Sequence, residues 1–432
     1  MVLSAALDHA LFGASPVGTH LTSLVLYGLA TGSVFALSFA VLRKREYAVI
    51  AALVWAWMPL HAELVVAASY REDLFAIVGV CTALALFLVP TPHAHGWGRA
   101  ALVAGSWSVG LMGKESALVL LVLLPWLTPF PWQRDAKGAP RWASFFVQRE
   151  RSITLLFLVL GVYLMWRYSL VLQGDGVARR EGLSSLHALP RYLLWGVSES
   201  LLPVRVQPFY SSLGDARATF WLPLAAMLAL AFGVRARPEG KALGMLLLGA
   251  LLTAPLVGPL NERADRYLGF TTVGTAWLAA LGVAWLARQD WPQARRSARL
   301  IALLCALLLA MRAASLARIW SSDLTLFQEA TERVPESAKA WDGLAWAERE
   351  RGRLDAAEAC LARSLRAEPG RPISRVSLAY MRLSRADREG ALRILEAMEE
   401  DGLEETPGFA HVWRCASDEG SPEQAAACVR GR

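Results

Sequence analysis

The sequence predicts an all-α protein in which a polytopic transmembrane domain, residues 1–317, is followed by a solenoid of paired helices, residues 318–432. Three observations predict this fold class. Of the 432 residues, 55% are hydrophobic, and the mean hydropathy is +0.36, which is too apolar for an ordinary soluble protein. Apolar residues dominate up to about residue 316. The polar remainder repeats with a period of about 34 residues.

Apolar runs and basic loops alternate along the first domain. Basic clusters such as Arg43 to Arg45 mark cytoplasmic loops, so the net charge of +7 indicates membrane topology rather than nucleic-acid binding. Placing every strongly basic loop inside gives about ten spans with both termini outside. Residues 190–202 are too short to span and are predicted to be re-entrant or interfacial. The predicted spans cover residues 21–42, 47–60, 74–89, 99–112, 116–130, 152–171, 219–235, 241–259, 268–287 and 300–317.

Three polar clusters interrupt the apolar sequence, and this topology puts all of them at the outer face. They are residues 58–73, the tripeptide Gly113-Lys114-Glu115, and residues 261–267. Ionisable groups are costly in hydrocarbon, so a cluster at a membrane mouth is a candidate functional site. Taken alone, the loop at 58–73 is better explained as an ordinary polar connection. The placement of all three clusters on one side favours a shared site.

The residue types in these clusters suit group transfer on a lipid phosphate. Carboxylates can act as a base on an acceptor hydroxyl or hold a divalent metal, and arginine and lysine can bind a phosphate. The carboxylates could therefore hold a divalent metal, but the sequence does not define which residues would be its ligands. The alternative for each residue is an interfacial ion pair or a snorkelling anchor, which we favour for Glu72, Glu262 and Arg263. The candidate catalytic residues are Glu63, Asp73 and Asp265, and the candidate substrate-binding residues are His61, Arg71, Lys114, Glu115, Arg266 and Tyr267.

The second domain has the spacing of tetratricopeptide repeats. Small residues such as Ala345 and Ala357 let paired helices approach closely, and Pro369 ends the second helix. Such an array offers a concave face for a peptide or a docking partner. Cys415 and Cys428 would lie at similar heights on the last two helices, as a disulfide or as two buried thiols. The repeat positions are Trp341, Leu344, Ala345, Ala357, Leu361 and Pro369, followed by Leu378, Ala379, Ala391 and Leu395.

The order of the short motifs resembles a known family. The motifs are Pro59-Leu60-His61-Ala62-Glu63, Arg71-Glu72-Asp73-Leu74, Gly113-Lys114-Glu115 and Asp265-Arg266-Tyr267. With the repeats behind them, they resemble the membrane glycosyltransferases of the GT-C class. Within that class they are similar to O-mannosyltransferase-like proteins that carry tetratricopeptide repeats, whose eukaryotic group targets cadherins. The resemblance covers nearly the whole chain.

The resemblance implies inverting transfer of a sugar, such as mannose, from a polyprenyl-phosphate donor to an acceptor hydroxyl, often on protein. This chemistry would take place at the extracytoplasmic face of a bacterial inner membrane, with the repeats on the same side. The family's usual catalytic acid lies in a loop after its first span, and the chain begins downstream of that loop. A late start codon, a decayed gene or a non-catalytic relative would each explain this.

We therefore predict that the chain is a glycosyltransferase. The sequence identifies no definite cofactor. Its expected partners are the lipid-linked sugar, a protein or peptide acceptor and the membrane, but no nucleic acid. The main alternative is a catalytically inactive relative that acts as a membrane-anchored docking protein. A transporter ranks third, because it predicts polar groups within the spans rather than at their ends.

Overall fold

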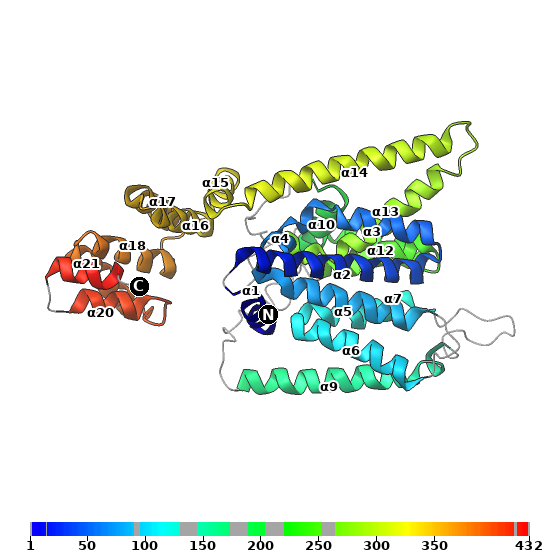
Figure 1. Ribbon diagram of the computed structural model, residues 1–432, viewed down its shortest axis with the longest axis horizontal. Helices are drawn as coiled ribbons and strands as arrows, with labels where there is room; N and C mark the ends of the chain where they lie inside the picture. The colour runs from blue at the N-terminus through cyan, green and yellow to red at the C-terminus, as the bar shows by residue number, and fades with distance from the viewer. Residues whose placement is uncertain are drawn as a thin grey trace. The chain divides into compact units, whose positions relative to one another are not determined.

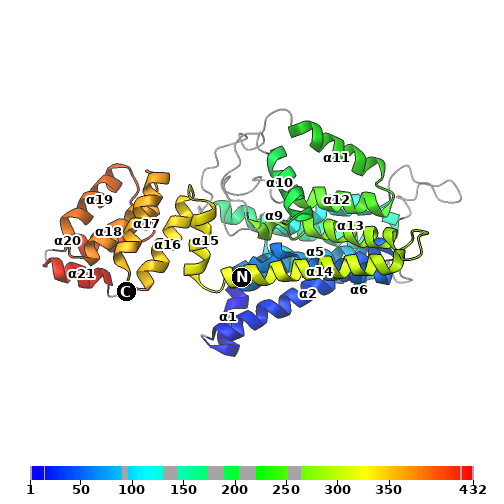
Figure 2. The same ribbon diagram turned by 90° about the horizontal axis from the view of Figure 1, so that it is seen from above.

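The computed structural model describes residues 2–13, 15–89, 96–129, 145–172, 189–203, 220–251, 264–418 and 421–430. Within these ranges every regular element is a helix, which confirms the predicted all-α class. By its internal contacts the chain divides into two units, the first ending at Arg318 and the second beginning at Ile319. Figures 1 and 2 show the helices of each unit.

The first unit consists of helices joined by short 3₁₀ turns. Its 3₁₀ segments are Pro59–His61, Ala68–Tyr70, Glu115–Val119 and Asp265–Leu268. Several of its longer helices run side by side (Figure 1). The helices are α1 (Val2–Phe12), α2 (Pro16–Leu42), α3 (Arg45–Ala56), α4 (Ala62–Val66), α5 (Arg71–Leu88), α6 (Trp97–Gly113), α7 (Leu120–Leu127), α9 (Glu150–Leu172), α10 (Leu189–Leu201), α11 (Trp221–Gly233), α12 (Pro238–Ala250), α13 (Thr271–Leu286) and α14 (Ala294–Ile319).

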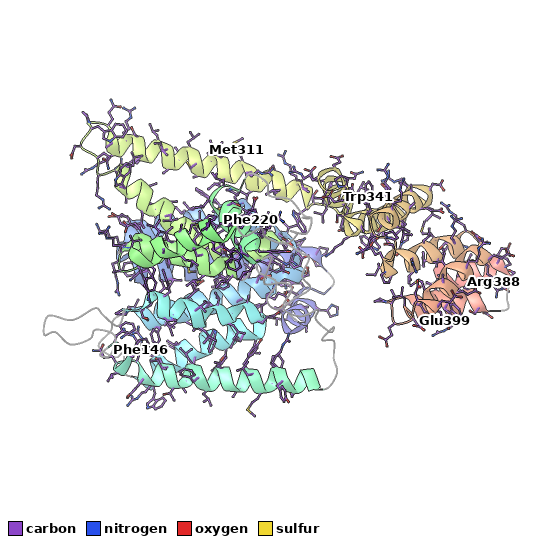
Figure 3. The ribbon with its side chains drawn as sticks, turned by 180° about the vertical axis from the view of Figure 1, so that it is seen from behind. Phe146, Phe220, Met311, Trp341, Arg388 and Glu399 are labelled. Atoms are coloured by element: carbon purple, nitrogen blue, oxygen red, sulfur yellow. A yellow bond between two sulfur atoms is a disulfide. The ribbon has the colours of Figure 1, made fainter. Side chains whose placement is uncertain are left out.

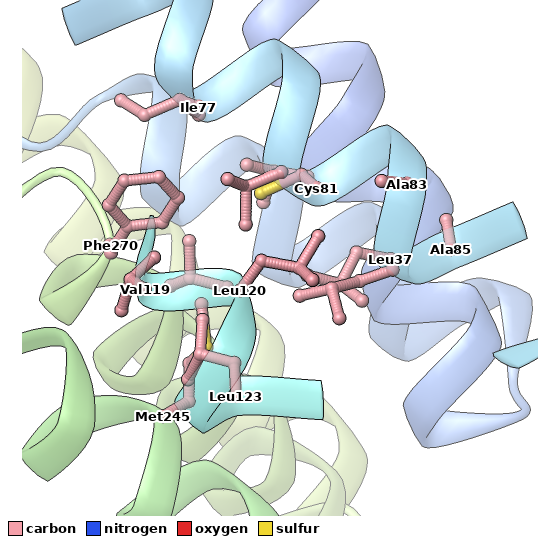
Figure 4. Close-up of a cluster of buried hydrophobic side chains, with 14 of the residues drawn as sticks. Leu37, Ile77, Cys81, Ala83, Ala85, Val119, Leu120, Leu123, Met245 and Phe270 are labelled. Carbon is pink, nitrogen blue, oxygen red and sulfur yellow. The ribbon is translucent and has the colours of Figure 1, made fainter. Parts of the chain in front are cut away.

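The core of this unit lies where α2, α5, α7 and α12 meet. Leu37, Cys81, Leu123 and Met245 come from these four helices and converge in Figure 4, each fully buried. Burying a large apolar side chain stabilises a fold by about 1.5–3 kcal/mol. Helix α5 packs most extensively against α2 and α6, so it is the centre of the unit.

Glycine allows α5 and α6 to approach at backbone distance. A Cβ atom added to Gly79 would lie 2.5 Å from the backbone nitrogen of Gly110, closer than any side chain tolerates. Small residues at such a crossing are typical of helices that pack inside membranes. The contact fixes the spacing of the two helices whose ends carry Asp73 and Lys114.

Three helices of the described residues are long and apolar enough to cross a membrane: α2, residues Glu150–Ser169 of α9, and α14. A bent pair, Arg45–Ala56 with Pro59–Val66, would make a fourth span with a 56° bend. Helices α9 and α14 bury little of their apolar surface, and Met311 on α14 projects outward in Figure 3. Such surfaces suit contact with lipid.

The remaining predicted spans coincide with shorter helices, so the arrangement of about ten spans stays a prediction. Helix α7, for example, has 8 residues and is preceded by a 3₁₀ segment, and a span needs about 20. Residues 252–259 of the predicted span 241–259, most of the predicted outer segment 172–218, and Glu262 and Arg263 lie outside the described residues.

The second unit is a succession of helical hairpins. Its inward positions include Trp341, Leu344, Ala357 and Leu361 in one cluster, while Ala379, Ala391 and Leu395 belong to the next. Successive helices α16 and α17, and then α18 and α19, pack against each other. The helices are α15 (Asp323–Arg333), α16 (Ala338–Glu350), α17 (Leu354–Ala367), α18 (Pro372–Ser384), α19 (Arg388–Glu400), α20 (Phe409–Ser417) and α21 (Pro422–Arg430).

The last hairpin is closed by a disulfide. Cys415 on α20 and Cys428 on α21 are bonded, with their Cα atoms 5.6 Å apart. Of the two alternatives that the spacing left open, the structure therefore has the disulfide rather than two free thiols. Both helices have 9 residues, and helices this short are marginal without tertiary support.

Candidate functional site

The first of two ion pairs at the candidate site joins residues that are far apart in sequence. Glu63 lies on α4, and Arg266 lies on the 3₁₀ segment Asp265–Leu268. Glu63 Oε1 and Arg266 Nη1 are 2.5 Å apart, and the two side chains are only 7% and 14% exposed. The Arg266 guanidinium also lies over the rings of Tyr70 and Tyr267, at 4.2 and 4.7 Å from their centroids. The arginine is thus held by charge and by two aromatic faces.

The second ion pair joins the start of α5 to the end of α6. Lys114 Nζ donates to both carboxylate oxygens of Asp73 at 2.7 and 2.8 Å, and Glu72 lies 3.4 Å away. Gly113 makes this contact possible, because a Cβ atom there would lie 2.9 Å from the carbonyl oxygen of Glu72. Any larger residue before Lys114 would push α6 away from α5.

Tyr267 brings the two ion pairs into one cluster. Lys114 Nζ lies 4.9 Å from the Tyr267 ring centroid, and Arg266 Nη2 lies 3.1 Å from its hydroxyl oxygen. Two cations therefore flank one ring, and each is held by its own carboxylate, Glu63 or Asp73. We call these five residues the ion-pair cluster. Burial weakens the screening by water, so each charge acts strongly on its neighbours.

His61 lies two positions before Glu63 and contacts residues of α2, α3 and α13. Its Nδ1 is 3.1 Å from the hydroxyl of Tyr27 on α2, and its Nε2 is 3.0 Å from the hydroxyl of Thr272 on α13. Its ring packs against Trp55 with centroids 4.3 Å apart. Both ring nitrogens are engaged, so His61 positions the turn that leads into Glu63.

Arg71 points away from the ion-pair cluster, toward α1 and α2. Its guanidinium donates to the carboxylate of Asp8 and the carbonyl of Thr19, and its Nε donates to Ser23 Oγ at 2.9 Å. Thr22 adds a hydrogen bond of 2.7 Å to Asp8. The structure thus separates Arg71 from the other candidate cations.

Asp8 is the partner that sequence reasoning missed. It is the first carboxylate of the chain, and the next, Glu46, comes much later in the sequence. A single carboxylate in an apolar segment has to pair with a polar group or stay in water. The isolation of Asp8 in the sequence was therefore the signal that could have identified it as a partner.

The other two candidate carboxylates lie near the cluster's segments. Asp265 is buried at the start of the 3₁₀ segment that carries Arg266, and Glu115 is partly exposed directly after Lys114. Among the described residues, no group of three His, Cys, Asp or Glu side chains is gathered closely enough to hold a metal ion.

Comparison with known proteins gives one partial match. A stretch of 180 residues is 31% identical to the protein O-mannosyl-transferase Tmtc1 of Drosophila melanogaster, covering 39% of this chain and 21% of the fly protein. The match therefore spans about a fifth of that relative's length. No family profile and no solved structure matches the chain. The chain is thus distantly similar to this O-mannosyl-transferase, and its apolar helices suit a membrane protein.

Proposed function

We propose that this chain is a membrane glycosyltransferase that moves a sugar from a polyprenyl-phosphate donor to an acceptor hydroxyl, on protein, at the extracytoplasmic face. The observation that carries the proposal is the ion-pair cluster, in which motif residues from three distant segments meet around Tyr267. The partial similarity to an O-mannosyl-transferase supports the same reaction class and suggests mannose as the sugar.

The cluster suits a single displacement with inversion. The acceptor oxygen attacks the anomeric carbon while its proton passes to a carboxylate, and the bond to phosphate breaks with its electron pair leaving on polyprenyl phosphate. Lys114 and Arg266 stabilise that leaving phosphate. When the donor phosphate takes over one cation, the carboxylate that held it is released and becomes the base. Asp73 and Glu63 are the first candidates, and Asp265 is the third.

The remaining predicted residues take supporting roles in this proposal. Tyr267 holds the two cations at a fixed separation, and His61 fixes the turn before Glu63. Glu115 lies next to Lys114 and helps to orient the acceptor. The contacts of Arg71 with Asp8 and Ser23 favour a positioning role over direct phosphate binding.

The second unit would dock the acceptor. A groove of about 670 Å³ lies over α18 and α19, and Leu378, Arg393 and Ile394 are among the residues that line it. Disulfides persist in oxidising compartments, so the bond between Cys415 and Cys428 supports an extracytoplasmic position for this unit. Repeats of the tetratricopeptide type present such surfaces to peptides.

A catalytically inactive docking protein is the second candidate. The observation that favours it is that Lys114 and Arg266 are already neutralised by Asp73 and Glu63, as in a purely structural ion pair. In that case the second unit alone would carry the function.

Variant kinetics separate these two candidates. With a radiolabelled polyprenyl-phosphate sugar, Asp73→Asn or Glu63→Gln should lower kcat by about 10²–10⁴-fold, the usual contribution of a general base. Lys114→Gln should lower kcat and raise KM for the donor, because Lys114 both binds the donor phosphate and stabilises it as it leaves. Glu239→Gln, an exposed acid at the start of α12, is the matched control and should retain full turnover. Wild-type kcat in both acid variants would contradict the assignment of the base.

A further inference from the structure

Three arginines meet at the end of α5 that lies opposite the ion-pair cluster. Arg43 follows α2, Arg99 lies in the first turn of α6, and Arg149 immediately precedes α9. In Figures 1 and 2 the last turn of α5 and the first turns of α6 and α9 lie at the same end of the unit. All three side chains donate to the last carbonyls of α5 and of its C-cap residue Val89, the groups that a helix leaves without intrahelical partners. The acceptors are Leu86 and Val89 for Arg99, Phe87 for Arg149 and Leu88 for Arg43.

The helix end neutralises only a small part of this charge. The C-terminus of a helix carries roughly half an elementary negative charge, whereas three guanidiniums bring three positive charges. Among the described residues, no carboxylate forms an ion pair with Arg43 or Arg149. We call Arg43, Arg99 and Arg149 the arginine cluster. Because Arg43 and Arg149 have no such partner, the arginine cluster keeps a net positive charge, in contrast to the ion-pair cluster.

The arginines repel one another, and Arg43 has further N–H groups that can donate to a ligand. Burial, together with the charges of Arg99 and Arg43, lowers the pKa of Arg149 to about 10, which leaves it charged at neutral pH. Arg43 donates a single hydrogen bond, from Nη2, and its side chain is exposed. An anion that bridges these guanidiniums would relieve their mutual repulsion.

The surroundings place the arginine cluster at the depth of lipid headgroups. Trp97 opens α6 and is 58% exposed, and Arg151 lies 5.1 Å from its ring centroid. The ring centroid of Phe145 lies 3.9 Å from Arg149 Cζ. Exposed tryptophans beside arginines are typical of the boundary between hydrocarbon and headgroups. These surroundings favour the phosphate of a lipid over a soluble anion.

We infer that the arginine cluster is a binding site for the phosphate of an anionic phospholipid. Basic sites between the cytoplasmic ends of membrane helices suit such headgroups. The site is distinct from the proposed donor site, because the 18 residues of α5, about 27 Å of helix, separate the two clusters. The bound lipid would fasten α2, α6 and α9 to the end of α5.

Native mass spectrometry of the purified full chain tests this inference. The protein is released from mixed micelles that contain equal amounts of phosphatidylglycerol and phosphatidylcholine, and the retained lipids are counted. We expect a preference for phosphatidylglycerol that falls about fivefold in Arg43→Gln and again in Arg43→Gln/Arg99→Gln, which corresponds to ~1 kcal/mol for each basic residue. Arg43→Lys, which keeps the charge, should retain most of the preference.

Arg296→Gln is the matched control, since it removes an exposed positive charge from α14 outside the cluster. The inference is overturned if the double variant keeps the wild-type preference, or if Arg296→Gln loses as much as Arg43→Gln. Excess inorganic phosphate should not displace the lipid; displacement would assign the site to a soluble anion instead. Circular dichroism of each variant in phosphatidylcholine alone shows whether it is folded.

Discussion

Charged side chains at the two ends of α5 are neutralised to different extents. At its first turn, Asp73 meets Lys114, and Glu63 meets Arg266 nearby, so every cation has a carboxylate. At its last turn, three arginines donate to backbone carbonyls, and neither Arg43 nor Arg149 is paired with a carboxylate among the described residues. One end therefore holds charges in balance, and the other keeps an excess of positive charge. The balanced end suits a reaction in which charges exchange partners, and the unbalanced end suits a permanent anionic ligand.

Breaking the ion pair between Glu63 and Arg266 should have the largest effect on stability. Arg266→Met leaves the buried carboxylate of Glu63 without its partner, and removing one member of a buried pair costs about 3–5 kcal/mol. The free energy of unfolding can be measured in detergent by denaturant titration. The double variant Glu63→Gln/Arg266→Met removes both charges and should recover most of the loss. A double variant no more stable than the single one would mean that the pair does not act as a unit.

Removing an arginine from the last turn of α5 should lower the free energy of unfolding by a smaller amount. Arg149→Met removes the donor to the Phe87 and Phe145 carbonyls, and leaving such groups without a partner costs about 1–3 kcal/mol. The same titration measures it, in phosphatidylcholine micelles so that no anionic lipid contributes. A loss as large as that of Arg266→Met would erase the distinction between the two ends.

An exposed ion pair of the second unit gives the smallest effect and sharpens the comparison. Arg385 is bonded to Asp355 and Glu358 on α17, and Asp355 is 99% exposed. Water and salt screen such pairs, so Arg385→Gln should change the free energy of unfolding by less than about 1 kcal/mol. The difference from wild type should shrink further in 1 M salt. A change near that of Arg266→Met would show that pairing matters more than burial.

The sequence predicted which motif residues would lie together at the candidate site better than how they would pair. Hydropathy and the positive-inside rule placed Asp73, Lys114 and Arg266 on one face, because those signals are local. The partners depend on helix packing: Glu63 and Arg266 are 203 positions apart, and no periodicity reports such a contact. Arg71 was grouped with the other cations for the same reason, although the fold turns it toward Asp8.

The limits of the fold prediction have a similar origin. Hydropathy windows located the helices but not their lengths, because a window counts apolar residues and does not detect a 3₁₀ segment such as Glu115–Val119. Arg43 was interpreted only as a topology marker. Its convergence with Arg99 and Arg149 on one helix end became visible only when α2, α5, α6 and α9 were packed together.

Turnover is the most direct test of the central claim, that the ion-pair cluster is a site of glycosyl transfer. Membranes that contain the wild-type chain are incubated with radiolabelled polyprenyl-phosphate mannose and, separately, with other polyprenyl-phosphate sugars. Matched membranes contain the double variant Glu63→Gln/Asp73→Asn or no added protein. We expect acceptor-dependent sugar release by the wild type alone. No release above the empty membranes with any donor, or equal release by the double variant, would contradict the claim.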